Sequence, residues 1–150
     1  MDIAIRESFI GMNKGDGGPY GAVIVKDGKV ISRGHNEVIK NNDPTCHAEI
    51  VVIRKACKKL GRFDISDCEI YSSCEPCPMC FSAIHWAKIR KLYFGCTAKD
   101  AAKIGFDDKF IYDVILGKAK KKQLSIKQIK RKEGLEAFKV WEKKKDRVNY

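Results

Sequence analysis

The sequence predicts an α/β protein with a mixed five-stranded sheet between helices, and three observations support this class. Segments with helical periodicity alternate along the chain with short runs rich in Val, Ile, Tyr and Phe. The first two runs flank an Asp-Gly pair, which is typical of an antiparallel hairpin. The later runs are followed by helical segments, an order that places helices on both faces of a sheet. The 150 residues fit a single domain, 1–150.

The N-terminal half is predicted to contain two helices and a hairpin. A broad apolar stripe predicts the first helix, and the loop Gly15–Pro19 follows it. The second helix carries its apolar residues on one face and ends at Gly61. The expected elements are a helix at 2–13, strands at 20–25 and 30–35, and a helix at 46–60.

The C-terminal half continues the alternation. Pro78 fits the first turn of a helix, where its missing N–H has no partner to lose. Residues 123–129 are ambiguous between strand and loop. In the last helix, Phe138 and Trp141 are expected to point inward. The expected elements are a strand at 69–73, a helix at 78–88, a strand at 91–95, short helices near 100–103 and 112–116, and a helix at 134–147.

Composition indicates a cytoplasmic protein without a membrane span. No apolar run approaches the roughly 18 residues that a membrane helix needs, and the N-terminus lacks the apolar region of a secretory signal. Seven cysteines, an odd number, suit a reducing compartment. The net charge is +11, and residues 118–147 carry 13 Lys and Arg against 4 Asp and Glu. This segment could bind a polyanion, but without an arginine cluster we favour a solvated lysine-rich face.

The stretch SSCEPCPMC predicts a metal site. Cys77 and Cys80 have the spacing that lets two thiolates reach one zinc ion. In the first turn of a helix, the helix dipole would also lower their pKa values. Cys74 ends the preceding strand and is expected to point away, so we predict two cysteine ligands. We expect the third ligand to be His47, in the first turn of its own helix, rather than His85.

Three protein ligands leave a fourth position for water, as in catalytic zinc sites. Glu49 lies two residues beyond His47, where it could exchange protons with that water without being a ligand. His47-Ala48-Glu49 and Pro76-Cys77-Pro78-Met79-Cys80 together match the signature of zinc deaminases, H-x-E followed by P-C-x-x-C. A redox pair or a structural zinc site is the alternative interpretation of the cysteines alone.

Four stretches extend this resemblance over almost the whole chain: GGPYGAVIVKDGKVISRGHNEV, NDPTCHAEIVVIRKACKKLG, CEIYSSCEPCPMCFSAIHWAKI and GFDDKFIYD. They resemble the guanine deaminases of the cytidine deaminase superfamily. The resemblance implies a cytidine deaminase-like three-layer α/β/α sandwich with one zinc ion per subunit. It also implies that water attacks C2 of guanine and that ammonia leaves, which gives xanthine.

The resemblance implies several substrate-binding residues. Asn36 matches an asparagine that hydrogen-bonds the base, and Asp108 matches an aspartate that pairs with polar atoms of the ring. Tyr150, at the chain end, matches a tyrosine that closes over the purine. Tyr20 and Ala48 are expected beside the substrate. Tyr20 departs from the family pattern, which usually has Phe there, and so adds a hydroxyl near the base.

The same resemblance implies a homodimer in which residues 134–150 exchange between subunits. The partners expected are a purine and a second copy of the chain, with no nucleic acid and no membrane. Four other readings stay open at this point. They are a guanosine deaminase, a tRNA adenosine deaminase, a cytosine deaminase, and a binding module whose zinc is structural. A terminal tyrosine lid would obstruct a nucleic acid chain, which argues against the tRNA enzyme.

Overall fold

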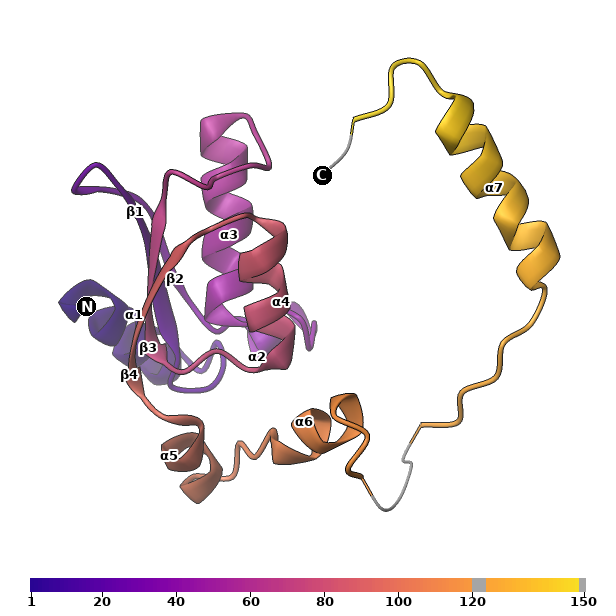
Figure 1. Cartoon of the computed structure of the whole chain (residues 1–150). Coiled ribbons are helices and arrows are strands. Elements are labelled where there is room, and N and C mark those ends of the chain that lie inside the picture. The colour runs from indigo at the N-terminus through magenta and orange to yellow at the C-terminus, as the bar shows by residue number, and fades with distance from the viewer. Residues whose placement is uncertain (120–123, 149–150) are drawn as a thin grey trace.

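The computed structural model describes residues 1–119 and 124–148, and within them four strands form one mixed sheet (Figure 1). The strands are β1 (Gly21–Lys26), β2 (Lys29–His35), β3 (Glu69–Cys74) and β4 (Lys91–Cys96). Their order is β2-β1-β3-β4. Strand β1 is antiparallel to both β2 and β3, whereas β3 and β4 are parallel. The α/β class and the mixed sheet are therefore confirmed.

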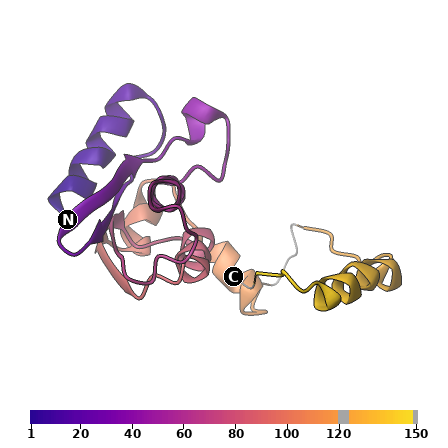
Figure 2. The ribbon, with the colours of Figure 1, turned by 90° about the horizontal axis from the view of Figure 1, so that it is seen from above.

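Helices lie on both faces of this sheet (Figures 1 and 2). The helices are α1 (Asp2–Lys14), α2 (Val38–Asn41), α3 (Ala48–Leu60), α4 (Pro78–Trp86), α5 (Ala98–Lys103), α6 (Lys109–Ile115) and α7 (Arg131–Lys143). Helix α1 covers one face, and α3 with α4 covers the other. Within the described residues, no helix has the length and apolar character needed to cross a membrane.

Local sequence chemistry explains several element boundaries. Gly15 and Gly61 end α1 and α3 in the left-handed conformation, with φ of 73° and 66°, which glycine adopts without steric cost. Asp27 and Gly28 both have positive φ between β1 and β2, the geometry of the hairpin turn that an Asp-Gly pair predicts. Pro78 occupies the first turn of α4 as expected.

Two glycines allow the helices to approach the sheet closely. A Cβ at Gly21 would lie 2.2 Å from the Ala4 carbonyl oxygen of α1, and one at Gly34 would lie 3.0 Å from Val51 of α3. The core between the sheet and α3 contains fully buried Ile24, Val52, Ile65 and Ile70. Burying each of these side chains stabilises the fold by about 1.5–3 kcal/mol.

The region after β4 departs from the sequence-based expectations. The fifth strand of the predicted sheet is absent from the described residues, and residues 124–130 have no regular structure. Helix α7 ends at Lys143 and lies apart from the sheet (Figures 1 and 2). Phe138 and Trp141, expected to point inward, are 67% and 42% exposed. That expectation was wrong for the single chain, because no other element of the described residues covers this helix face.

Candidate metal centre and active site

The predicted ligands stand where two helices begin. His47 is the N-cap residue of α3, and Cys77 is the N-cap residue of α4, each in an extended conformation just outside its helix. Cys80 lies in the first turn of α4. Before His47, the Asp43 carboxylate accepts hydrogen bonds from the Thr45 N–H and hydroxyl at 2.8 and 2.7 Å. This turn directs the chain into α3 with His47 at its start.

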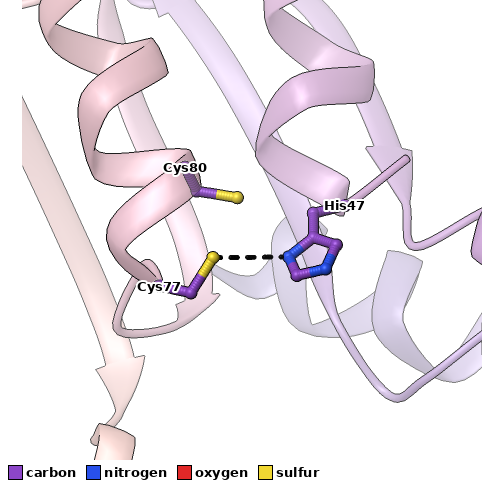
Figure 3. Close-up of side chains that lie close together, drawn as sticks. All are labelled: His47, Cys77 and Cys80. Atoms are coloured by element: carbon purple, nitrogen blue, oxygen red, sulfur yellow. Dashed lines mark hydrogen bonds between the residues drawn. The ribbon is translucent and has the colours of Figure 1, made fainter. Parts of the chain in front are cut away.

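The ligand atoms of His47, Cys77 and Cys80 all lie within 4.8 Å of one another (Figure 3). The Cys77 Sγ and the His47 Nδ1 are 3.5 Å apart. A tetrahedral zinc ion with ordinary Zn–S and Zn–N bonds holds sulfur and nitrogen about 3.5–3.6 Å apart. One nitrogen and two sulfurs are also the donor set that zinc prefers. These residues therefore fit a zinc ion in both spacing and chemistry.

Charge within this cluster favours the metal-binding form of Cys77. A hydrogen bond from Cys80, followed by that from His47, lowers the pKa of the Cys77 thiol to about 4 despite its burial. The hydrogen bond with Cys77 raises the pKa of His47 above its ordinary value. The hydrogen bond between the two thiols is also the largest cause that raises the pKa of Cys80. The thiolate is the form that binds metal. One thiolate is thus already favoured at the start of α4.

The other candidate ligands lie outside the cluster. The Cys74 Sγ donates to the Thr97 carbonyl oxygen at 3.6 Å, so it turns toward the α5 side. His85 is exposed on α4 and meets the Phe81 ring edge-on at 4.6 Å. Within the described residues, the one group suited to a metal is His47, Cys77 and Cys80.

Glu49 places a buried carboxyl group beside this cluster. Its side chain is 6% exposed, and the Ser72 hydroxyl donates to Glu49 Oε1 at 2.8 Å. Burial raises the pKa of Glu49, while hydrogen bonds from the backbone, Ser72 and Cys80 oppose that rise. A carboxyl group with a raised pKa exchanges protons more readily near neutral pH. Glu49 can therefore accept and return a proton at the metal centre.

Asn36 follows β2 with its side chain buried at 4% exposure. The Val38 N–H donates to its Oδ1 at 3.1 Å, and its own backbone N–H donates to the Tyr20 carbonyl oxygen at 2.9 Å. Because Oδ1 already accepts, the amide NH₂ is the group that Asn36 can offer to a ligand. Ala48, between the metal ligand and the acid, is fully buried.

Tyr20 has a buried hydroxyl without a hydrogen-bond partner among the described residues. Burial first, then the charges of Cys74 and Asp108, raises the pKa of Tyr20 to about 12. The Phe106 ring meets the Tyr20 ring edge-on at 5.2 Å. A buried hydroxyl without a partner costs free energy unless a ligand or water satisfies it.

Asp108 stands at the N-cap of α6, but its side chain makes no capping hydrogen bond. Burial raises the pKa of Asp108, and the charge of Cys77 raises it further. Tyr150 lies outside the described residues. Tyr20 precedes β1, Asn36 follows β2, and Ser72, which bonds Glu49, lies near the end of β3. Because β1 is antiparallel to β2 and β3, these residues lie at the same end of the sheet.

Three residues near the site were not singled out from the sequence. Ser72 hydrogen-bonds Glu49, Phe106 packs against Tyr20, and the Tyr112 hydroxyl donates to the Pro76 carbonyl oxygen at 3.5 Å. Strand alternation could have identified Ser72, because it lies two residues after the core residue Ile70 on the face toward α3. The other two contacts join segments 30 or more residues apart, and the sequence carries no local signal for them.

The sequence pattern described as the cytidine and deoxycytidylate deaminase zinc-binding region matches residues 1–96. The guanine deaminase of Bacillus subtilis (strain 168) is 48% identical over 138 residues, which cover 92% of this chain and 88% of that protein. An X-ray structure of guanine deaminase from Bacillus subtilis superposes with a TM-score of 0.92 at 46% identity. The match covers 98% of this chain and 94% of that chain.

A tRNA-specific adenosine deaminase from Aquifex aeolicus is 40% identical over 99 residues, which cover 66% of this chain and 65% of that protein. The matched family pattern contains all three ligand residues of the cluster and Glu49. It spans well over half of the 150 residues. The chain therefore belongs to the cytidine and deoxycytidylate deaminase zinc-binding family.

Proposed function

We propose that this protein hydrolyses guanine to xanthine and ammonia with one zinc ion per subunit. The observation that carries this proposal is the buried carboxyl of Glu49 beside a group of three residues suited to zinc. The similarity to a guanine deaminase covers 138 of 150 residues and so must extend past residue 96 into the segment that contains Asp108. That segment supplies part of the proposed substrate pocket.

His47, Cys77 and Cys80 would hold the zinc ion. Bound zinc supplies a Lewis acid that lowers the pKa of water toward about 7. Glu49 accepts a proton from the attacking water as the new C2–O bond forms. It passes this proton to the ring nitrogen next to C2. It then takes the second proton from the new C2 hydroxyl and gives it to the amine, so the C2–N bond breaks, a C2 carbonyl forms and ammonia leaves. The hydrogen bond from Ser72 keeps the Glu49 carboxyl oriented during both transfers.

The proposed substrate-binding residues are Asn36, Asp108, Tyr20, Ala48 and Tyr150. The amide NH₂ of Asn36 would donate to an acceptor atom of the base, and the Asp108 carboxylate would accept from ring N–H groups. The Tyr20 hydroxyl, which lacks a partner among the described residues, would bond the base or a water beside it. Ala48 would form the wall next to the metal, and Tyr150 would close over the purine.

We also propose a homodimer in which residues 134–150 of each chain complete the partner's pocket. The apolar side chains of α7 are exposed in the single chain, and β4 is an edge strand of the sheet. An apolar groove of about 560 Å³ between α3 and α4 includes Ile53 and Trp86. Exposed apolar surfaces of this kind mark interfaces. The expected dimer would cover the apolar face of α7, the edge strand β4 and this groove, around a three-layer α/β/α sandwich in each subunit.

Complementation tests the exchange. A Glu49→Gln chain supplies an intact C-terminus, and a chain lacking Tyr150 supplies an intact Glu49. If the segments exchange, mixing the two inactive proteins forms heterodimers with one complete site, and guanine turnover returns. If every site is built within one chain, the mixture stays inactive. Sedimentation over a range of concentrations measures the dimer independently.

A tRNA adenosine deaminase is the second candidate, because one such enzyme is 40% identical over 99 residues and this chain carries a net charge of +11. Binding of the basic segment 118–147 to phosphates would weaken steeply with salt. The proposed closure by Tyr150 favours a free purine base. A guanosine deaminase would need room for ribose in the same pocket.

The experiment is ammonia release by the zinc-loaded protein from guanine, guanosine, cytosine and adenine, with inosine formation in tRNA measured in parallel. Guanine turnover well above the others supports the proposal. Guanosine turnover above guanine means that the pocket is open beyond N9. Inosine formation in tRNA without guanine turnover would refute guanine as the substrate, but it would leave the proposed zinc-dependent deamination in place. We place the reaction in the cytoplasm, in keeping with the seven free cysteines.

A further inference from the structure

A buried histidine lies between two carboxylates beside the proposed base-binding residue. His35 ends β2, and its ring faces α1. Its Nδ1 is 3.2 Å from Glu7 Oε2, and its Nε2 is 2.8 Å from Asp16 Oδ2. His35 and Glu7 are both only 8% exposed. A ring with an acceptor at each nitrogen satisfies both contacts when both nitrogens carry protons.

Asp16 is a junction between segments that are separate in the sequence. Its backbone N–H donates to the Gly11 carbonyl oxygen of α1 at 3.0 Å. Its carbonyl oxygen accepts from the N–H groups of Ile39 and Lys40 in α2, each at 3.0 Å. The contact between Asp16 and His35 therefore connects α1, the loop at 15–19, β2 and α2.

The loop held by Asp16 is in direct contact with Asn36. A Cβ at Gly17 would lie 2.0 Å from Asn36 Oδ1, so the loop backbone packs against the side-chain amide. On the other side, a Cβ at Gly11 would lie 2.5 Å from the His35 ring. The ring thus occupies a fixed place between α1 and the loop. Asn36, the next residue, is therefore held in place by α1 through His35 and by the loop through Gly17.

We propose that His35 is a positioning residue: by donating to Glu7 and Asp16, it holds Asn36 and the loop at 15–19 in the geometry that receives the substrate. The proposal rests on guanine deamination as the activity. The surrounding charges are consistent with this role. Arg33 Nε lies 3.4 Å from Glu7 Oε1. The hydrogen bond with His35, and then the charges of Lys40 and Lys14, lower the pKa of Asp16. His35 acts on the substrate only through Asn36.

The first test compares Asp16→Asn with Asp27→Asn as its matched control. Asparagine keeps the shape of Asp16 but removes the charge that accepts from His35. We expect the KM for guanine to rise about tenfold while kcat changes little, because a residue that orients the bound base contributes to ground-state and transition-state binding alike. Asp27 lies in the β1–β2 turn, far from the loop, and its variant should leave both constants unchanged.

Gly11→Ala is the second variant. Alanine favours the helix by about 1 kcal/mol relative to glycine, yet its Cβ would displace the His35 ring. A purely structural role of His35 predicts a change in thermal stability with an unchanged KM. The positioning role predicts a raised KM in a protein that still binds zinc. An unchanged KM in both Gly11→Ala and Asp16→Asn would overturn the proposal.

Nuclear magnetic resonance gives a readout that does not depend on turnover. The chain contains three histidines, and His35→Gln identifies the ring signals of His35. We expect the His35 ring signals and the side-chain NH₂ signals of Asn36 to shift in Asp16→Asn but not in Asp27→Asn. If the His35 or the Asn36 signals stay unchanged in Asp16→Asn, the positioning role is refuted. If these shifts occur but the wild-type protein does not deaminate guanine, the proposed function is overturned and the structural link from His35 to Asn36 stands.

Discussion

Replacing Ser72 with alanine removes the hydroxyl that donates to the buried Glu49 carboxyl at 2.8 Å. Hydrogen bonds to charged groups contribute about 1.5–3 kcal/mol. Burial already raises the pKa of Glu49, and the Ser72 bond opposes that rise, so the variant holds less carboxylate at any given pH. If Glu49 takes the proton from water, this loss lowers kcat/KM for guanine by up to roughly 10- to 150-fold on the acid limb of the pH profile, where most of the Glu49 carboxyl is protonated.

The assay is kcat/KM for guanine as a function of pH. The acid limb of the Ser72→Ala profile should move to higher pH, so activity partly returns as pH rises. Ser73→Ala is the matched control, because Ser73 is equally part of β3 but its Oγ accepts from the Gly21 N–H on the other side of the strand. That variant should lose stability without moving the acid limb. Coincident profiles for Ser72→Ala and wild type would refute the role assigned to Glu49.

Three further predictions concern the metal, the acid–base group and the surface. Glu49→Gln should retain zinc, measured by metal analysis, and lose about 10²–10⁴-fold in turnover; undiminished ammonia release would contradict the mechanism. Cys77→Ser should lose zinc and activity, whereas Cys74→Ser should retain zinc, since Cys74 lies outside the metal cluster; equal zinc contents would show that the cluster is misassigned. Hydrogen bonds from Ser66, then Lys88, lower the pKa of Asp64 to about 2, below its usual value near 3.9. A lowered pKa stabilises the fold above about pH 4, and this contribution is lost as pH falls toward 2. The free energy of unfolding in urea should therefore differ between wild type and Asp64→Asn most strongly above pH 4, and the difference should vanish near pH 2. A difference that does not depend on pH would be evidence against the contacts of Asp64 with Ser66 and Lys88.

Local sequence signals predicted every element up to residue 96 except helix α2. The Asp27-Gly28 turn, the C-cap glycines and Pro78 each act within a few residues of the boundary they set, so their effect can be read without knowing the fold. Helix α2 was missed because its four residues have no apolar periodicity. Helix α5 begins two residues earlier than expected, where Thr97 and Asp100 form a capping box.

The region after residue 96 was harder to predict, because many of its large apolar side chains stay exposed within the described chain. Leu124 and Ile126 alternate with polar residues, as in a strand, but the pattern breaks at Gln128. A strand also forms only where it can pair with the edge of a sheet. Helix α7 keeps its amphipathic pattern while leaving Phe138 and Trp141 exposed. An amphipathic pattern predicts which face of a helix will be buried, but it does not predict which surface will cover that face.

The metal ligands and Glu49 were predictable because residue type and spacing within each helix start restrict their chemistry. The resemblance added Asn36, Tyr20 and Asp108, which spacing alone would not have selected. Ser72 and the pair of His35 with Asp16 were not predicted as site residues. Their partners are 23 and 19 residues away in sequence, and nothing local indicates which chain segment they will meet.

The sequence by itself determined the α/β class, the helix starts that carry His47, Cys77 and Cys80, and the presence of an acid two residues after the histidine. These features depend on short-range sterics and on side-chain chemistry. Only the tertiary structure decided that the starts of α3 and α4 meet within 4.8 Å and that Glu49 is buried against Ser72. It also decided that His35 is enclosed by two carboxylates. Such contacts depend on packing between distant segments, where the free energy of burial and hydrogen bonding selects one arrangement of many.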